Sequence, residues 1–190
     1  MEKEELDGER IFLLHSFLSP EECDHFIART EEAGYADAPI TTAVGFVMRK
    51  DIRDNDRVMI DHEELARQLF ERARPMLPAT WFGWELAGFN ERFRFYRYGP
   101  GQRFAAHTDG YYERPNGERS HLTFMVYLNE GFDGGATLFE RWRDSLDVVP
   151  RAGMALVFYH KLVHEGAEVL KGRKYVLRTD VMYRRAASNK

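Results

Sequence analysis

The pattern of apolar and polar positions changes about halfway along the chain. Between residues 92 and 183, short segments alternate apolar with polar positions or are rich in Val, Tyr, Phe and Thr. A period of two residues is typical of strands that bury one face. We therefore predict strands over six segments: 92–98, 102–109, 120–129, 136–140, 154–160 and 174–183.

Turn residues separate these segments. Gly99-Pro100-Gly101 predicts a type II turn, Asn116-Gly117 predicts a tight reversal, and Gly134-Gly135 predicts unusual backbone angles. Many short strands separated by turns favour a sandwich, a barrel or a jelly roll.

The first half of the chain has a helical period instead. Ser19-Pro20-Glu21-Glu22 is a helix start, and apolar residues follow it at helical spacing as far as Gly34. A second helix is expected to begin near Asp61 and to stop at Pro75 and Pro78, while residues 41–48 predict a strand. Helices first and strands later favour a mainly β fold in which flanking N-terminal helices pack against a β core.

Length and composition bound the class of protein. The chain has 190 residues, 44% of them hydrophobic, and a formal charge of −4. This suits a single domain over residues 1–190, with a supporting and lid region over 1–90 and the β core over 91–185. Acidic and basic residues are mixed along the chain, so we expect no nucleic-acid partner.

No apolar run is long enough to cross a membrane, so we expect no membrane association either. Cys23 is the only cysteine, and the acidic first ten residues contain no apolar stretch. These features predict a cytoplasmic protein. The sequence predicts no oligomeric state.

The segment RFAAHTDGYY (103–112) places His107 and Asp109 two residues apart at the end of a predicted strand. Residues i and i+2 of a strand face the same side, so an imidazole and a carboxylate should project together. With one more histidine they would form the two-histidine, one-carboxylate set that holds non-haem Fe(II) and leaves three positions open. His164 is the best third ligand, since it follows an apolar strand and lies near a strand end.

The open positions suit a bidentate organic acid and O2. If that acid carries a second carboxylate, a cation is needed about one molecule-length from the metal. Lys174 lies ten residues after His164 on a predicted strand, and Arg178 shares its parity, so both side chains should point inward. The residues alone leave open which of the two binds the second carboxylate.

Four motifs then resemble one known family. They are YGPGQRFAAHTDG (98–110), HLTFMVYLN (121–129), FDGGATLF (132–139) and HEGAEVLKGRKY (164–175). Together they resemble the Fe(II)- and 2-oxoglutarate-dependent oxygenases, specifically the prolyl 4-hydroxylase-like group, over about residues 90–183. The N-terminal half, including DIRDNDRVMID (51–61), is similar to bacterial members of unassigned substrate.

The resemblance implies a double-stranded β-helix, or jelly-roll, core and a set of site residues. His107, Asp109 and His164 would bind iron and form the catalytic centre. Lys174 would bind the distal carboxylate of 2-oxoglutarate, with Arg178 as a second inward cation. Tyr98 and Thr123 would donate hydrogen bonds to the same co-substrate.

The resemblance also implies a reaction. O2 would decarboxylate 2-oxoglutarate to succinate and CO2, and an unactivated C–H bond of a prolyl residue or an amino acid would be hydroxylated, with ascorbate in support. The substrate would be a small molecule or a peptide. Asp109 is retained, and halogenating members lose this carboxylate, so hydroxylation is favoured over halogenation.

Other residues are candidates for contacts to the substrate. The charged segment 49–57 predicts either a solvated loop or a lid over the site, with Arg53, Asn55 and Arg57 as substrate contacts. His121 shares the parity of Thr123 and is a further candidate. His160 is expected to make structural hydrogen bonds rather than to bind metal.

Two alternatives remain at this point. One is the same chemistry on another small molecule or a modified nucleobase. The other is a non-catalytic jelly-roll module that binds a ligand or a protein partner, because a His-x-Asp pair alone is weak evidence for a metal.

Overall fold

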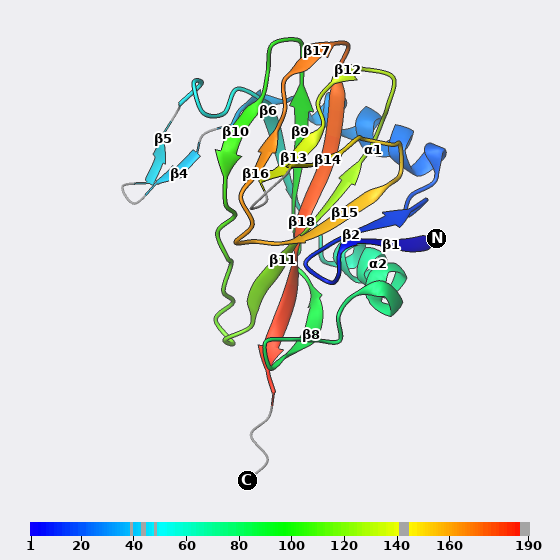
Figure 1. Ribbon diagram of the computed structural model, residues 1–190, viewed down its shortest axis with the longest axis vertical. Coiled ribbons are helices and arrows are strands. Elements are labelled where there is room, and N and C mark those ends of the chain that lie inside the picture. Colours follow the sequence, from blue (N-terminus) through cyan, green and yellow to red (C-terminus); the bar gives the residue numbers. More distant parts are fainter. Residues whose placement is uncertain (39, 43–44, 48, 141–144, 187–190) are drawn as a thin grey trace.

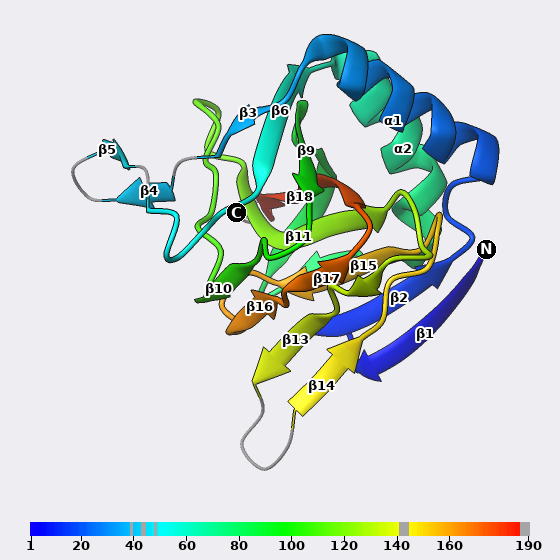
Figure 2. The ribbon, with the colours of Figure 1, turned by 90° about the horizontal axis from the view of Figure 1, so that it is seen from above.

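Two antiparallel sheets lie face to face, and two helices cover the outer face of the larger sheet (Figure 1, Figure 2). The computed structural model describes residues 1–38, 40–42, 45–47, 49–140 and 145–186. Neither described helix is long and apolar enough to span a bilayer.

The larger sheet runs across the whole molecule. In spatial order its strands are β1 (Glu2–Asp7), β2 (Ile11–His15), β15 (Ala155–Tyr159), β11 (Arg119–Tyr127), β18 (Lys174–Arg185), β9 (Arg92–Tyr98), β6 (Asp56–Asp61) and β3 (Ala36–Asp37). Off this path, β8 (Trp84–Phe89) pairs with β18, and β7 (Thr80–Trp81) pairs with β8.

The smaller sheet contains β10 (Phe104–His107), β16 (His164–Gly166), β13 (Thr137–Glu140) and β14 (Ser145–Val148), in that order. Two further antiparallel pairs are β12 (Asp133–Gly134) with β17 (Val169–Lys171), and β4 (Ile40–Thr42) with β5 (Gly45–Val47). Figure 2 shows the smaller sheet on the side of the larger sheet opposite the helices.

The helices begin where the sequence predicts. In α1 (Pro20–Ala33), the Ser19 hydroxyl accepts from the Glu22 amide at 3.2 Å, and the Glu22 carboxylate accepts from the Ser19 amide at 2.8 Å. Gly34 then ends the helix at a φ of 82°. Helix α2 (Glu63–Ala73) continues into a 3-10 turn, η1 (Arg74–Met76). Pro75 therefore tightens the last turn, because a proline fits near the start of a helical segment.

Strand parity divides the apolar side chains into two cores. On β2, Phe12 and Leu14 face the helices, whereas Ile11 and Leu13 face the smaller sheet. On β18, Leu177 faces the helices and Val176 faces the smaller sheet. Since alternate residues point to opposite faces, Lys174 and Arg178 share the inter-sheet side with Val176.

The predicted turns are confirmed. Gln102 donates its amide to the carbonyl of Gly99 at 3.1 Å, and Gly101 has a φ of 83°, as a type II turn around Pro100 requires. Both Gly134 and Gly135 have positive φ, at 76° and 68°.

The prediction of one strand over 41–48 was wrong. Strands β4 and β5 form an antiparallel pair, with Ile40 opposite Val47, and residues 43, 44 and 48 lie outside the described residues. The N-terminal half also contributes more strands than predicted. Strands β2, β6 and β8 extend the larger sheet by pairing with β15, β9 and β18.

Candidate active site

Three residues distant in sequence meet at one end of the smaller sheet. His107 ends β10, Asp109 lies two residues beyond it, and His164 begins β16. Strands β10 and β16 are antiparallel, and His107 is directly opposite His164 in their register. One ligand atom from each residue lies within 4.8 Å of the other two. The predicted cluster therefore forms, and strand pairing is what brings His164 to the other two.

Each imidazole presents its Nε2 atom to the cluster. Nδ1 of His107 donates to the carbonyl of Ala105 at 2.8 Å, and Nδ1 of His164 donates to the carbonyl of Leu162 at 3.0 Å. A carbonyl can only accept, so these contacts fix the tautomers and leave both Nε2 lone pairs free. The two Nε2 atoms lie 3.8 and 3.7 Å from the Asp109 carboxylate oxygens.

The protonation states suit a divalent cation. Burial and the nearby His164 lower the pKa of His107 to about 4, and burial also lowers the pKa of His164. Burial alone would raise the pKa of Asp109, but Arg178 and the surrounding histidines bring it well below its ordinary value. Near neutral pH the cluster is thus two neutral imidazoles and one carboxylate, the protonation states that metal ligands need.

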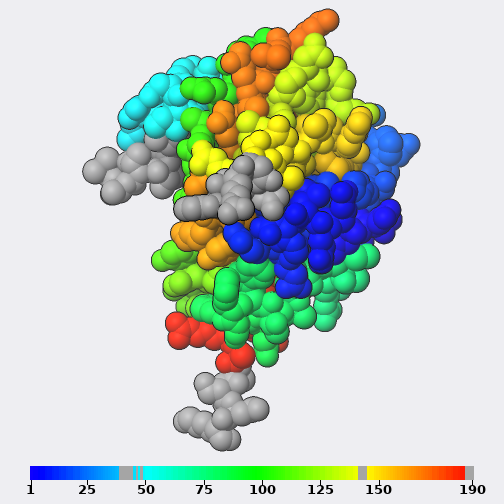
Figure 3. Space-filling view, viewed as in Figure 1, coloured from blue at the N-terminus to red at the C-terminus, as the bar shows by residue number. Residues whose placement is uncertain are grey.

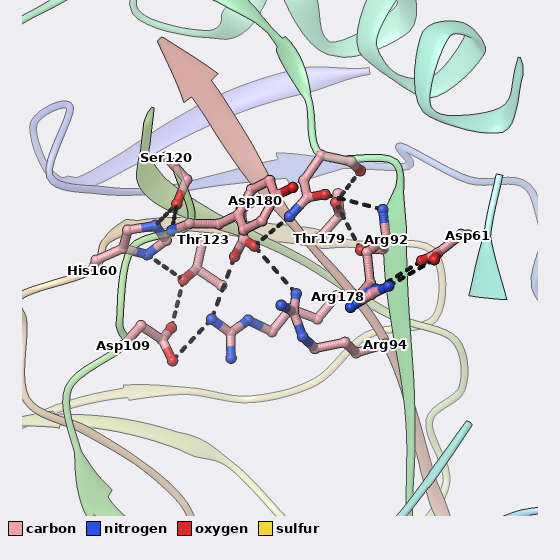
Figure 4. Close-up of polar contacts among 12 residues, drawn as sticks. Asp61, Arg92, Arg94, Asp109, Ser120, Thr123, His160, Arg178, Thr179 and Asp180 are labelled. Carbon is pink, nitrogen blue, oxygen red and sulfur yellow. Dashed lines mark hydrogen bonds and ion pairs between the residues drawn. The ribbon is translucent and has the colours of Figure 1, made fainter. Parts of the chain in front are cut away.

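A line of hydrogen bonds holds Asp109 in place (Figure 4). The Thr123 hydroxyl donates to Oδ2 of Asp109 at 2.5 Å and contacts Nδ1 of His160 at 3.0 Å. Nε2 of His160 lies 2.9 Å from the hydroxyl of Ser120. Burial lowers the pKa of His160 to about 4, so its ring is neutral and can donate to Thr123 while it accepts from Ser120.

This network bears on the predictions for Thr123 and His160, and the co-substrate contact predicted for Thr123 stays a prediction. We expected Thr123 to hydrogen-bond the co-substrate, but its hydroxyl is used to orient the carboxylate of Asp109. His160 makes structural hydrogen bonds, as we expected. The parity of β11 predicted that Thr123 points inward, whereas its partner lies on a loop that the pattern of β11 does not reach.

Arg178 lies on the other side of Asp109. Its guanidinium is 2.9 Å from Oδ1 of Asp109 and 3.4 Å from Oδ1 of Asp180, as Figure 4 shows. Arg94 reaches Oδ2 of the same Asp180 at 3.2 Å. Arg178 is therefore held by two carboxylates of the chain, which leaves it less suited than Lys174 to bind the co-substrate.

A narrow cavity of about 40 Å³, here called the inner cavity, leads from the cluster between the two sheets. Lys174 lies at its side with 3% of its surface exposed. Its ammonium donates to the carbonyl of Gly135 at 2.6 Å and lies 5.3 and 5.5 Å from the ring centroids of Tyr98 and Tyr127. No carboxylate of the described residues pairs with it. Burial consequently lowers the pKa of Lys174 to about 7.

The wall beside Lys174 is made of backbone at Gly134 and Gly135. A Cβ atom on Gly134 would lie 2.4 Å from the carbonyl oxygen of Glu168. A Cβ atom on Gly135 would lie 2.9 Å from the ring of Phe132 and 3.2 Å from Cδ of Lys174. Only glycine fits here, since both positions also have positive φ.

Hydroxyl groups line the same cavity. Tyr98 lines it as predicted, and its hydroxyl makes no hydrogen bond within the described residues. Thr137 also lines it, with its hydroxyl 2.7 Å from that of Tyr127. Thr137 was not among the predicted site residues, although its place in the Gly-Gly-x-Thr motif (134–137) was an available signal.

A wider cleft of about 500 Å³, here called the outer cleft, opens on the other side of the cluster. Arg53 and Arg57 line it together with Tyr111 and Tyr112, and their contacts to a substrate stay a prediction. Asn55 is buried and holds Nε of Arg53 at 2.8 Å, so it positions Arg53 rather than lining the cleft.

The segment before β6 lies against β10. The amide of Asp54 donates to the carbonyl of Arg103, and the amide of Ala105 donates to the carbonyl of Ile52. Figure 3 shows this part of the chain, in cyan, at the surface beside β10, in green. These contacts put the segment at the rim of the outer cleft; its movement as a lid remains a prediction.

The structure places His121 away from both cavities. Its ring packs against Trp84 and Tyr183, with centroids 5.1 and 5.7 Å apart. It is absent from the described residues that line the inner cavity and the outer cleft. Strand β11 has a register irregularity between Ser120 and Leu122 in its pairing with β18, so the parity shared with Thr123 does not carry through this point.

Comparison with known proteins agrees with this arrangement. The sequence profile of the 2OG-Fe(II) oxygenase superfamily matches residues 93–179, a range that contains the cluster and Lys174. Over this range the chain is similar to the 2OG-Fe(II) oxygenase superfamily. The chain is also 25% identical to prolyl 4-hydroxylase 1 of Arabidopsis thaliana, over 87% of this chain and 66% of that relative. The chain thus spans just under two thirds of the relative's length.

Solved structures of the superfamily have the same fold. A prolyl hydroxylase from Trichoplax adhaerens, in complex with a hypoxia inducible factor oxygen degradation domain peptide fragment, has a TM-score of 0.71 and 16% identity over 93% of this chain and 84% of that chain. A Pseudomonas putida prolyl-4-hydroxylase has a TM-score of 0.67 and 24% identity over 92% of each chain. The predicted jelly-roll core with flanking helices is thereby confirmed.

The residues present fit the superfamily's Fe(II) and 2-oxoglutarate. Two imidazoles and one carboxylate converge, with their free donor atoms aimed at one point. A buried lysine beside that point has no carboxylate partner among the described residues. A buried ammonium without an anion is costly, and a dicarboxylate chelated at the cluster would supply that anion.

Proposed function

We propose that this protein is an Fe(II)- and 2-oxoglutarate-dependent dioxygenase that hydroxylates an unactivated C–H bond of a prolyl residue or an amino acid. Succinate and CO2 are the other products. The observation that carries the proposal is the coexistence of the His107, Asp109 and His164 cluster with the unpaired cation of Lys174 beside one cavity. A metal-binding structural site would need the first but not the second.

The residues divide the work between binding and positioning. His107, Asp109 and His164 would hold Fe(II) through two imidazole nitrogens and one carboxylate. Lys174 binds the distal carboxylate of 2-oxoglutarate, with the hydroxyls of Tyr98 and Thr137 nearby. When bound, Fe(II) with O2 and 2-oxoglutarate supplies the oxidising power that converts C–H to C–OH.

Buried side chains around the cluster exclude water from the reaction. Phe104 stacks on the His107 ring with centroids 3.6 Å apart, and the Phe158 ring lies 4.5 Å from that of His164. Thr123 keeps Asp109 oriented as a ligand. Arg178 balances the charge of Asp109 without occupying the Nε2 atoms of the histidines.

The substrate class rests on the relatives. Prolyl hydroxylases among the similar proteins favour a prolyl substrate, and the one solved with a peptide favours a peptide or a small molecule that resembles part of one. Ascorbate is expected to support turnover. A cytoplasmic location is part of the proposal, supported by Cys23, which is buried and forms no disulfide.

The test is turnover of the co-substrate. The protein with Fe(II), ascorbate and 2-oxoglutarate labelled at its first carbon should release labelled CO2, faster when a substrate is added. The substrate should gain one oxygen atom by mass spectrometry. Asp109→Ala should abolish release, whereas Asp61→Ala, at an exposed ion pair with Arg92, should retain it. Absence of both turnover and metal-dependent binding of 2-oxoglutarate would contradict the proposal.

A further inference from the structure

The outer cleft contains more positive charge than its own acidic residues neutralise. Four arginines line it, against two aspartates. Both aspartates already have partners, since Asp109 pairs with Arg178, and Asp180 pairs with Arg178 and Arg94. Arg53 and Arg57 are the two that remain, and neither has an ion pair within the described residues.

Arg53 is buried with one of its nitrogens unused. Its exposed fraction is 6%, and its guanidinium lies between the rings of Tyr96 and Phe104, 4.6 Å from each centroid. Nε donates to Asn55, but Nη2 is buried and has no hydrogen-bond partner. A guanidinium stays charged at any ordinary pH, so this unmade hydrogen bond is costly, and a ligand that accepts it would relieve the cost.

Arg57 adds a second unpaired charge. It lies on β6 directly opposite Tyr96, and it lines the same cleft. Of the acidic residues near it in sequence, Asp51 pairs with Arg49 and Asp56 pairs with Arg97, and Asp54 has no ion pair with Arg57 within the described residues. Residues 39, 43, 44 and 48, just upstream, include no acidic side chain.

The pKa of Tyr96 shows that the electrostatic potential at its hydroxyl is positive. Burial alone would raise the pKa of Tyr96, but Arg53, Arg178 and Arg94 together lower it below its ordinary value. A fully buried tyrosine whose pKa is lowered lies in a strongly positive potential. A bound anion would lie in the same potential.

The unpaired charge is close to the metal ligands. Phe104 contacts the guanidinium of Arg53 on one side and stacks on the ring of His107 on the other. Phe104 therefore contacts both Arg53 and a residue of the candidate metal cluster. An anion bound by Arg53 would lie close to that cluster, which suits a carboxylate on the residue that reacts.

We propose that Arg53 and Arg57 bind a carboxylate carried by the very residue that is oxidised. This rests on the proposed function and narrows it. A substrate that is an amino acid has one anion built into its backbone, its α-carboxylate, and planar guanidinium groups match a carboxylate with paired hydrogen bonds. The preferred substrate is then a free amino acid or the C-terminal residue of a peptide, rather than a residue within a polypeptide, whose carbonyl is neutral.

The test compares each carboxylic acid with its own amide. The probes are L-proline with L-prolinamide and N-acetyl-L-proline with N-acetyl-L-prolinamide, followed by the same pairs for the other amino acids. Binding is measured by isothermal titration calorimetry on the protein alone and on the protein with Zn(II) and 2-oxoglutarate. At least one acid should bind about tenfold to hundredfold more tightly than its amide. The free and N-acetylated pairs distinguish an amino acid from a peptide C-terminus.

Three variants connect the preference to the cleft. Arg57→Gln and Arg53→Gln should each lower the acid-to-amide ratio about tenfold or more, and leave binding of 2-oxoglutarate unchanged. Arg67→Gln, at an exposed pair with Glu64 on α2, should leave both unchanged. Arg53 packs between two rings, so its substitution can disturb the fold, and circular dichroism checks whether the Arg53→Gln variant is folded. If that variant does not fold, the result for Arg57→Gln alone tests the proposal.

Equal binding of acid and amide in every pair would overturn the proposal, and so would a preference that survives Arg57→Gln. Failure of the proposed function looks different. In that case 2-oxoglutarate neither binds with metal nor turns over, whatever the acid-to-amide ratio.

Discussion

The inner cavity and the outer cleft both border His107 and Asp109, and each contains a cation that has no ion pair among the described residues. The two cavities differ in the type of cationic side chain and in how far that side chain is buried. The inner cavity holds one lysine, almost fully buried, against two tyrosine rings and a single carbonyl. The outer cleft is wider and holds arginines, of which Arg53 is stacked between aromatic rings.

The difference shows how one protein can make two anion-binding sites chemically distinct. An ammonium in a dry pocket can lose its proton when no anion is present, and the lowered pKa of Lys174 shows this tendency. A guanidinium cannot, so the charge of the outer cleft is permanent. One site therefore changes its charge when its ligand binds, whereas the other stays charged. Substitutions at the residues that the two cavities share should therefore have larger effects than substitutions in either cavity alone.

The largest loss of activity is expected at His107, which borders both the inner cavity and the outer cleft. His107→Ala should lower turnover of 2-oxoglutarate by more than about 100-fold, because loss even of groups that only support metal ligands costs 10–100-fold. The fold should persist, since His107 lies outside both apolar cores. Assays of CO2 release and circular dichroism check this, with the exposed His25→Ala as the control. Retained turnover in His107→Ala would remove the metal centre from the mechanism.

Lys174→Met should act on the inner cavity alone. The affinity for 2-oxoglutarate should fall about tenfold to hundredfold, because hydrogen bonds to charged groups contribute about 1.5–3 kcal/mol. Arg57→Gln is the matched control and should leave this affinity unchanged. If Lys174→Met binds 2-oxoglutarate normally, Arg178 is the anchor instead.

The same variant should stabilise the protein without its ligand. Burial lowers the pKa of Lys174 in the folded protein to about 7. At pH values below the pKa of this lysine in the unfolded chain, burying the charged ammonium therefore disfavours folding. This penalty is complete below about pH 7 and fades as the pH rises toward about 10.4. Denaturant unfolding at about pH 6 should show Lys174→Met to be more stable by about 2–5 kcal/mol. A loss of stability would mean that Lys174 is not desolvated.

Binding of 2-oxoglutarate should itself depend on pH. An anion beside Lys174 restores its proton, so the affinity should fall by up to about tenfold per pH unit above about pH 7. Tyr98 and Tyr127 face the same ammonium, but burial raises the pKa of both, and they stay neutral in this range. Calorimetry at pH 8 in buffers of different ionisation enthalpy should detect proton uptake, and Lys174→Arg should abolish it.

Thr123→Val tests the support of the shared centre. It removes the hydroxyl that orients Asp109 and leaves His160 without that partner. Metal affinity should fall about tenfold, and Thr123→Ser should restore it. An effect on 2-oxoglutarate affinity with metal binding intact would instead return Thr123 to the role first expected of it.

The smallest effect is expected at Asn55, which positions Arg53 in the outer cleft. Asn55→Ala should lower the acid-to-amide ratio by about threefold to tenfold, the worth of one ordinary hydrogen bond. Asn116→Ala, on an exposed turn, is the control. A change in turnover rate with the ratio intact would show that Asn55 acts on the fold rather than on Arg53.

The sequence predicted the parts of this site that depend on local geometry. The spacing of His107 and Asp109, the turn at Gly101 and the start of α1 all depend on a few neighbouring residues. The register between distant strands does not depend on neighbouring residues. The residues near His164 in sequence therefore do not predict that it lies opposite His107. The contact between Thr123 and Asp109 was missed for the same reason, because it joins a strand to a loop fourteen residues away.

The missed elements also have physical causes. Strand β1 has the sequence EKEELD and buries little of it, so it carries no apolar alternation. Strand β16 has three residues, too few to show a period. His121 was misplaced because alternation was extended across a register irregularity in β11. Patterns of apolar residues predict the faces of long regular strands and give little information at bulges, edges and very short strands.

The glycine wall beside Lys174 has a consequence for altering this protein. A Cβ atom at Gly134 would collide with the carbonyl oxygen of Glu168, and one at Gly135 would collide with the ring of Phe132. Substitutions there can only damage the co-substrate pocket. Arg53 lies in the segment before β6 and is buried, whereas Arg57 lies on β6 and is only partly buried. Directed evolution toward new substrates should therefore succeed first at Arg57, with the proposed 2-oxoglutarate site left as it is.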